Sequence, residues 1–111
     1  MAELEEIVGY LDTELKVSEI KDYPGAVNGL QLANNGEVTR IVSAVDASLA
    51  VVEEAAASGG GLLLVHHGMF WQGARPLTGA FYRKIKAAMD GNLAIYSSHL
   101  PLDMHPVFGN N

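Results

Sequence analysis

Short apolar segments alternate with helix-like segments along this 111-residue chain, and this alternation constrains the fold more than any other feature. Residues 62–65 are wholly apolar, as expected for a strand that is covered on both faces. Two further strand-like runs, 40–45 and 93–97, lie on either side of it, and predicted helices connect the three runs. Strands that alternate with crossover helices predict an α/β fold with a mainly parallel sheet and helices on both faces, a three-layer α/β/α arrangement.

The chain is expected to begin with a helix. Three glutamates lie in its first turn, where the helix dipole favours anions, and apolar residues recur at helical spacing. These apolar residues are Leu4, Ile7, Val8, Leu11 and Leu15. The turn signals Tyr23-Pro24-Gly25 and Asn34-Asn35-Gly36 then predict mostly irregular structure over residues 22–38.

Two more helices are predicted between the strands. Asp46 and Ser48 are both candidate N-caps for a helix that runs to about Ala57, where Gly59-Gly60-Gly61 ends it. The next helix is capped by Thr78, ends at Gly91 and is expected to bury one stripe while keeping its basic residues largely outside. The stripe is Phe81, Ile85 and Met89, and the basic residues are Arg83, Lys84 and Lys86.

Composition excludes several classes of protein. Hydrophobic residues make up 49% and charged residues 18%, so we expect one ordered domain over residues 1–111 rather than a disordered chain. A net charge of −6 argues against general nucleic-acid binding, and no segment has the roughly 20 apolar residues that a membrane span needs. The acidic start differs from a secretory signal, so a cytoplasmic location is expected. Because the sequence has no cysteine, any metal must be bound by imidazole and carboxylate groups.

Unusual polar residues follow the predicted strands. Asp46 ends the first strand, His66 and His67 follow the second, and the third leads to His99 and on to Asp103 and His105. In open α/β sheets, ligands bind beyond the carboxyl ends of the strands. Adjacent residues within a strand point to opposite faces, but at a strand end His66 and His67 could serve one site. Imidazoles with a carboxylate are the ligand set of zinc, manganese, iron or nickel.

Simpler roles compete with this interpretation. A single histidine more often caps backbone groups or titrates in a cleft, but several converging with Asp103 favour a metal or catalytic site. For Asp46 the helix N-cap is the preferred role, and for Phe70 and Trp71 it is packing. The glycines at 59–61 precede a strand and are no phosphate loop, and Ser97 and Ser98 are weak nucleophile candidates because neither lies on a strand-to-helix elbow.

The segments 63–71 and 98–106, closing on Gly109-Asn110-Asn111, resemble the Nif-three-like dinuclear metal centre family. These are YbgI-like proteins that are often called GTP cyclohydrolase 1 type 2 homologues. The earlier segments Asn28-Gly29-Leu30-Gln31 and Val45-Asp46-Ala47-Ser48 resemble the first half of that family in the same order. The resemblance spans nearly the whole chain.

The resemblance implies a ligand set. His66 and His67 match the paired-histidine metal ligands, Asp103 matches the carboxylate close to both metals, and His99 matches a further histidine of the site. It implies up to two divalent ions, such as Zn, Fe, Mn or Ni, with His105 as a residue that orients a ligand, and a homo-oligomer, since family members form toroidal hexamers. Family chains are more than twice as long, and their second half supplies a further His and Glu, so this chain is expected to be the amino-terminal part with half of the metal site.

Three functions follow as alternatives. The first is a metal-dependent hydrolase acting on a small molecule, for example a nucleotide or a cyclic amide, with no catalytic residue assigned and partial metal occupancy expected. The second is a metal- or ligand-binding or regulatory protein-interaction module without turnover. The third is an inactive oligomerising fragment whose histidines bind no metal.

Overall fold

A four-stranded sheet forms the centre of the computed structural model, which describes residues 2–22, 26–58, 61–70, 75–107 and 109. Across the sheet the strands follow the order β2 (Gly29–Leu32), β6 (Leu93–Ser97), β5 (Gly61–His67) and β4 (Ile41–Asp46). The last three are parallel to one another, and β2 is antiparallel to β6. A small second sheet pairs β1, Ala2–Glu3, with β3, Glu37–Val38, in antiparallel orientation.

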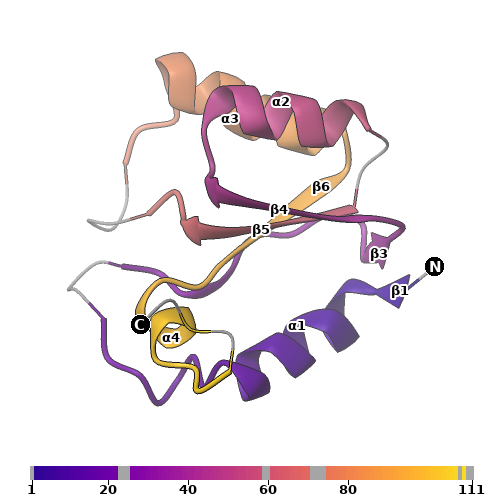
Figure 1. Ribbon diagram of the computed structural model, residues 1–111. Helices are drawn as coiled ribbons and strands as arrows, with labels where there is room; N and C mark the ends of the chain where they lie inside the picture. Colours follow the sequence, from indigo (N-terminus) through magenta and orange to yellow (C-terminus); the bar gives the residue numbers. More distant parts are fainter. Residues whose placement is uncertain (1, 23–25, 59–60, 71–74, 108, 110–111) are drawn as a thin grey trace.

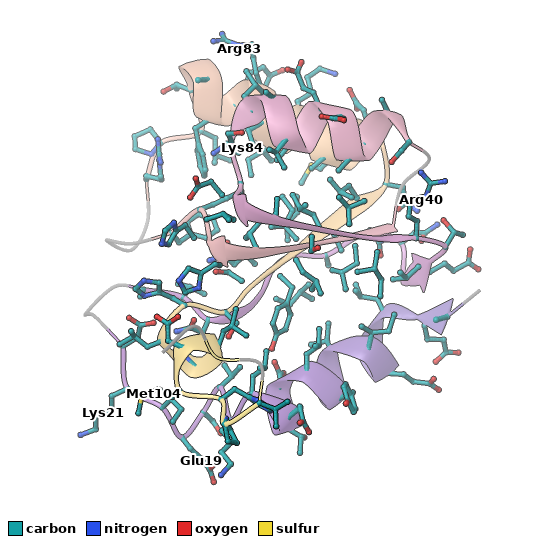
Figure 2. All side chains as sticks on the ribbon, in the orientation of Figure 1. Glu19, Lys21, Arg40, Arg83, Lys84 and Met104 are labelled. Atoms are coloured by element: carbon teal, nitrogen blue, oxygen red, sulfur yellow. The ribbon has the colours of Figure 1, made fainter. Side chains whose placement is uncertain are left out.

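Helices cover both faces of the sheet (Figure 1). On one face lie α2, Leu49–Ala57, and α3, Gly79–Asp90, and on the other lie α1, Leu4–Glu14, and the short α4, Leu100–Asp103. Each interlayer space has its own apolar core, and Figure 2 shows side chains filling both. The predicted α/β fold with a mainly parallel sheet and crossover helices is therefore confirmed.

Three strands lie where none was expected. The prediction of irregular structure over residues 22–38 is wrong in part, because β2 and β3 fall within it, and β1 precedes the first helix. Strand β2 is four residues long and pairs through a register shift between Leu30 and Leu32, so it is too short for a pattern to reveal. Its place depends on the antiparallel pairing with β6, which comes much later in the chain.

The second and third helices begin as predicted. Ser48 caps α2, since its hydroxyl oxygen accepts a hydrogen bond from the backbone N–H of Val51 at 3.2 Å. Thr78 occupies the N-cap position of α3 without a side-chain capping bond. Gly59 and Gly60, predicted to end α2, lie outside the described residues, and the helix C-cap is Ser58.

The buried stripe of α3 differs from the prediction at one position. Phe81 is buried and Ile85 packs against the same core, but Met89 is 63% exposed and Ala88 is buried in its place. Of the basic residues, Arg83 points away from the body of the protein (Figure 2), whereas Lys84 is only half-exposed and desolvation lowers its pKa. No helix among the described residues is long and apolar enough to cross a lipid bilayer.

Candidate metal centre

His66 and His67 are the last two residues of β5. The sequence predicts that they follow the strand, and the structure instead extends the strand through both of them. Their ring centroids nevertheless lie only 4.6 Å apart, because at a strand end both side chains can turn beyond the edge of the sheet. The structure thus brings the two adjacent imidazoles into one site.

His99 completes a group of three imidazoles. The register pairs Val65 of β5 with Ser97 of β6, so the last two residues of β5 lie beside the residues that follow β6. The His99 ring lies 4.9 Å from that of His66 and 5.4 Å from that of His67. One nitrogen of each ring lies within 4.8 Å of the others, and the three half-buried residues could hold a metal ion.

Each of the three rings has its Nδ1 atom beside an acceptor. For His66 the acceptor is the carbonyl oxygen of Ser98 at 2.9 Å, for His67 it is Asp46 Oδ1 at 2.7 Å, and for His99 it is Asp22 Oδ1 at 3.1 Å. An acceptor at Nδ1 favours the tautomer that carries its proton there, and Nε2 is then the coordinating nitrogen. This is the arrangement in which histidines usually bind metals, so the donor set fits a divalent ion.

Asp103 brings a carboxylate to the same edge of the sheet. It is the last residue of α4, and its Oδ1 lies 3.7 Å from Nε2 of His66. Both side chains are mostly buried, with 15% and 17% of their surfaces exposed. Asp103 is not part of the three-histidine group itself, but its carboxylate is close enough to His66 to contact an ion bound there.

The remaining residues singled out in the sequence have other roles. Asp46 does not cap α2, because Ser48 does; it binds the His67 ring instead. His105 Nε2 lies 2.9 Å from Glu14 Oε1, and its Nδ1 accepts a hydrogen bond from the backbone N–H of Val107, so this ring joins the segment after α4 to α1. Phe70 packs edge-on against Phe81, as expected for packing, and Trp71 lies outside the described residues.

A largely apolar cavity of about 420 Å³ lies beside the imidazoles, on the α1 face of the sheet. His66 lines the cavity and is also a member of the three-histidine group. Ser98 also lines the cavity, and its buried hydroxyl has no hydrogen-bond partner among the described residues. The apolar walls come from α1, β5 and α4 and the turn after α1, through Leu11, Leu15, Leu64 and Leu102.

Three polar residues near the site had not been identified from the sequence as supporting it. Asp22 contacts His99, and Asn28 Oδ1 accepts a hydrogen bond from the His99 backbone N–H at 2.7 Å. Gln31 Oε1 accepts one from the backbone N–H of Met69 at 2.8 Å, just beyond the histidine pair. Asn28 and Gln31 lie in a segment that was noted only for its family resemblance, and no local pattern marks Asp22.

Comparison with known proteins identifies the family. The family model for Duf34/NIF3, NGG1p interacting factor 3, matches residues 2–111. This chain belongs to the NIF3 family. A curated relative from Pyrococcus abyssi, named GTP cyclohydrolase 1 type 2 homolog, is 42% identical over 109 residues, which cover 98% of this chain and 43% of the relative.

Solved NIF3-like structures share the fold. TTHA1606 from Thermus thermophilus superposes with a TM-score of 0.92 at 35% identity, covering 99% of this chain and 45% of that one. Protein ybgI, described as of unknown function, gives a TM-score of 0.89 at 36% identity and is covered over 44% of its length. The chain therefore spans less than half the length of these family members.

Proposed function

We propose that this chain provides part of the metal centre of a metal-dependent hydrolase of the NIF3 family. His66, His67 and Asp103 are the proposed metal ligands, and His99 is a further ligand or a residue that lines the site. The observation that carries the proposal is the convergence of three imidazoles whose Nδ1 atoms all face acceptors, with the Asp103 carboxylate beside them.

The donor set limits which ions fit. Imidazole and carboxylate without thiolate suit zinc, iron, manganese or nickel. Such an ion, when bound, lowers the pKa of a bound water and polarises a carbonyl or phosphoryl oxygen. The chain's own contribution is to hold three imidazoles and one carboxylate at the carboxyl ends of β5 and β6.

Charge bears on how many ions bind. Two divalent ions carry four positive charges, and Asp103 supplies only one negative charge to balance them. Asp22 and Asp46 lie behind the imidazoles and each adds one more at longer range. We therefore expect one ion to bind more tightly than two, unless residues outside this chain add ligands.

The test is the metal content of the chain, purified without chelators or an immobilised-metal column. Elemental analysis that finds about one to two ions per chain supports the metal centre, and about zero counts against it. Hydrolysis of a nucleotide such as GTP, abolished by a chelator and restored by the ion, supports the hydrolase. Absence of turnover by a metal-loaded chain, measured against a panel of nucleotides and cyclic amides, counts against it.

A second function, ligand binding without turnover, is favoured by the apolar cavity beside His66. The cavity walls suit an apolar group, and the Ser98 hydroxyl, which has no partner among the described residues, lies in the same wall. Calorimetry that detects binding of a small ligand by a metal-loaded but inactive chain would favour this function over the hydrolase. A chain that contains no metal and associates with increasing concentration would instead favour the oligomerising fragment.

We also propose that the chain forms a homo-oligomer. Strand β4 is at the edge of the four-stranded sheet, and its Ile41 and Val45 side chains are 52% and 61% exposed. Exposed apolar side chains on an edge strand favour pairing with another copy. Light scattering should show a mass above 11.8 kDa at high concentration, and a monomer there would contradict the proposal.

A further inference from the structure

Asp22 is a buried carboxylate in the segment that follows α1. Its side chain is only 4% exposed, which is rare for an aspartate unless it is fully hydrogen-bonded. It lies 77 positions before His99 in the sequence, yet both of its oxygens are close to the His99 ring, at 3.1 and 3.2 Å from Nδ1. A charge buried at this depth needs several donors, and the structure provides them.

Three donors converge on this carboxylate. Besides the His99 ring, Oδ2 accepts hydrogen bonds from the Asn28 side-chain amide and from the backbone N–H of Leu100, each at 3.0 Å. Asn28 in turn accepts a hydrogen bond from the His99 backbone N–H through its Oδ1 atom at 2.7 Å. The His99 ring is thus held by Asp22 and its backbone by Asn28.

The bond to Leu100 extends this arrangement to a second candidate ligand. Leu100 is the first residue of α4, and Asp103 is the last residue of the same single turn. A carboxylate that accepts the first N–H of a helix fixes where that helix begins. Asp22 therefore contacts the element that carries Asp103 as well as the ring of His99.

We propose that Asp22 is a positioning residue of the metal centre, which sets the His99 tautomer and the placement of α4 with Asp103. The inference rests on the proposed function, since it concerns the same site. Outer partners of metal-binding histidines commonly fix ring orientation and tautomer, and their loss weakens metal binding about 10–100-fold.

The chemistry requires a carboxylate at this position. Two carboxylate oxygens can accept from all three donors, whereas an asparagine offers one oxygen and an NH₂ group that only donates. In Asp22→Asn at least one of the three donors would face another donor. The variant keeps the size of the side chain, so it tests the acceptor capacity of residue 22 rather than packing.

The first measurement needs no metal and no variant. Nitrogen-15 NMR of the metal-free wild-type chain at pH 8 reports which ring nitrogen of His99 carries the proton. We expect the proton on Nδ1, facing Asp22. A His99 ring with its proton on Nε2 would overturn the proposal whether or not any variant folds.

The second measurement is zinc affinity in folded variants. By calorimetry, Asp22→Asn should bind zinc about 10–100-fold more weakly than wild type. Nitrogen-15 NMR of the same variant should show that the His99 proton is no longer held on Nδ1 alone. Asn28→Ala, which removes a neighbour but keeps the Asp22–His99 contact, should be less stable and yet retain the tautomer. Asp90→Asn, in an exposed ion pair with Lys86 on α3, is the matched control and should bind zinc as wild type does.

The outcomes separate this inference from the proposed function. A wild-type chain that binds no zinc but shows the Nδ1 proton on His99, lost in Asp22→Asn, contradicts the metal centre and supports the placement of His99 by Asp22. A folded Asp22→Asn chain with wild-type tautomer and zinc affinity overturns the positioning role and leaves the metal centre standing.

Discussion

Asp46 Oδ1 lies 2.7 Å from Nδ1 of His67, and the two residues are register partners on the adjacent parallel strands β4 and β5. The pairing places a carboxylate behind a candidate metal ligand at the point where both strands end. The Asp46 side chain is 65% exposed and the His67 side chain 44%, so water competes for this contact. It therefore differs from the buried pair of Asp22 and His99, although both pairs join an aspartate Oδ1 to a histidine Nδ1.

Replacing Asp46 with asparagine should weaken zinc binding by about tenfold, at the lower end of the range for outer partners of metal ligands. The amide oxygen can still accept a hydrogen bond from the His67 ring, but the negative charge behind the ring is lost. Calorimetric titration with zinc, repeated at low and high salt, measures the effect. The difference from wild type should shrink at high salt, since exposed charges are screened, and a difference that salt does not change would contradict this account.

Replacing Asp103 with alanine should reduce metal content more strongly than either outer carboxylate. Asp103 is the carboxylate nearest His66, and its removal takes away a proposed ligand rather than a residue behind one. We expect affinity to fall beyond the 10–100-fold typical of outer-partner changes, leaving no metal on the purified chain. Elemental analysis of Asp103→Ala beside Asp90→Ala checks this, and equal metal content in the two variants would refute a ligand role.

Local patterns predicted the parts of the fold that local energetics decide. The apolar run in β5 and the Ser48 cap of α2 depend on neighbours within a few residues, so the sequence revealed them. The buried stripe of α3 was predicted one residue out of phase at its end. Ala88 is seven positions after Phe81, about two helical turns, so the two residues lie on nearly the same side of α3, whereas Met89 is rotated toward solvent.

Contacts between distant segments were beyond local patterns. Strand β2 exists because β6 offers it a partner, and Asp22 supports the site only because the fold brings it to His99. The histidines could be found in advance since parallel strands present their carboxyl ends at one edge. Their hydrogen-bond partners could not, because a buried acceptor carries no sequence signature of its own.

Two glycines should respond to alanine in opposite directions. Gly61 has a φ of +123°, and a Cβ there would overlap the backbone carbonyl of Arg40, so Gly61→Ala should destabilise the fold by several kcal/mol, roughly as severe strain does. Gly9 lies on the exposed side of α1 with open space around it, so Gly9→Ala should stabilise by about 0.5–1 kcal/mol. Urea unfolding of the two variants measures both changes, and a shift of the same sign in both would contradict the backbone argument.

Tyr96 should make the stability of the fold depend on pH in the alkaline range. Its ring is buried in the core between the sheet and α1, and its hydroxyl donates a hydrogen bond to Asp12 Oδ1 at 2.7 Å. Burial and then the Asp12 carboxylate raise the pKa of Tyr96 far above its ordinary value. The unfolded chain loses this proton near pH 10 while the folded chain keeps it, so the contribution is complete below about pH 10 and is lost as pH rises further.

Urea unfolding at pH 8, 10 and 11 tests this contribution against Tyr96→Phe. At pH 8 the variant should be less stable by about 1–3 kcal/mol, because Asp12 loses a hydrogen-bond partner. Above pH 10 the wild-type free energy of unfolding should fall more steeply than that of Tyr96→Phe, so the two values converge. Tyr82→Phe, at a position 49% exposed on α3, should keep the wild-type slope. A Tyr96→Phe chain that loses stability above pH 10 as steeply as wild type would show that the alkaline sensitivity arises elsewhere in the molecule.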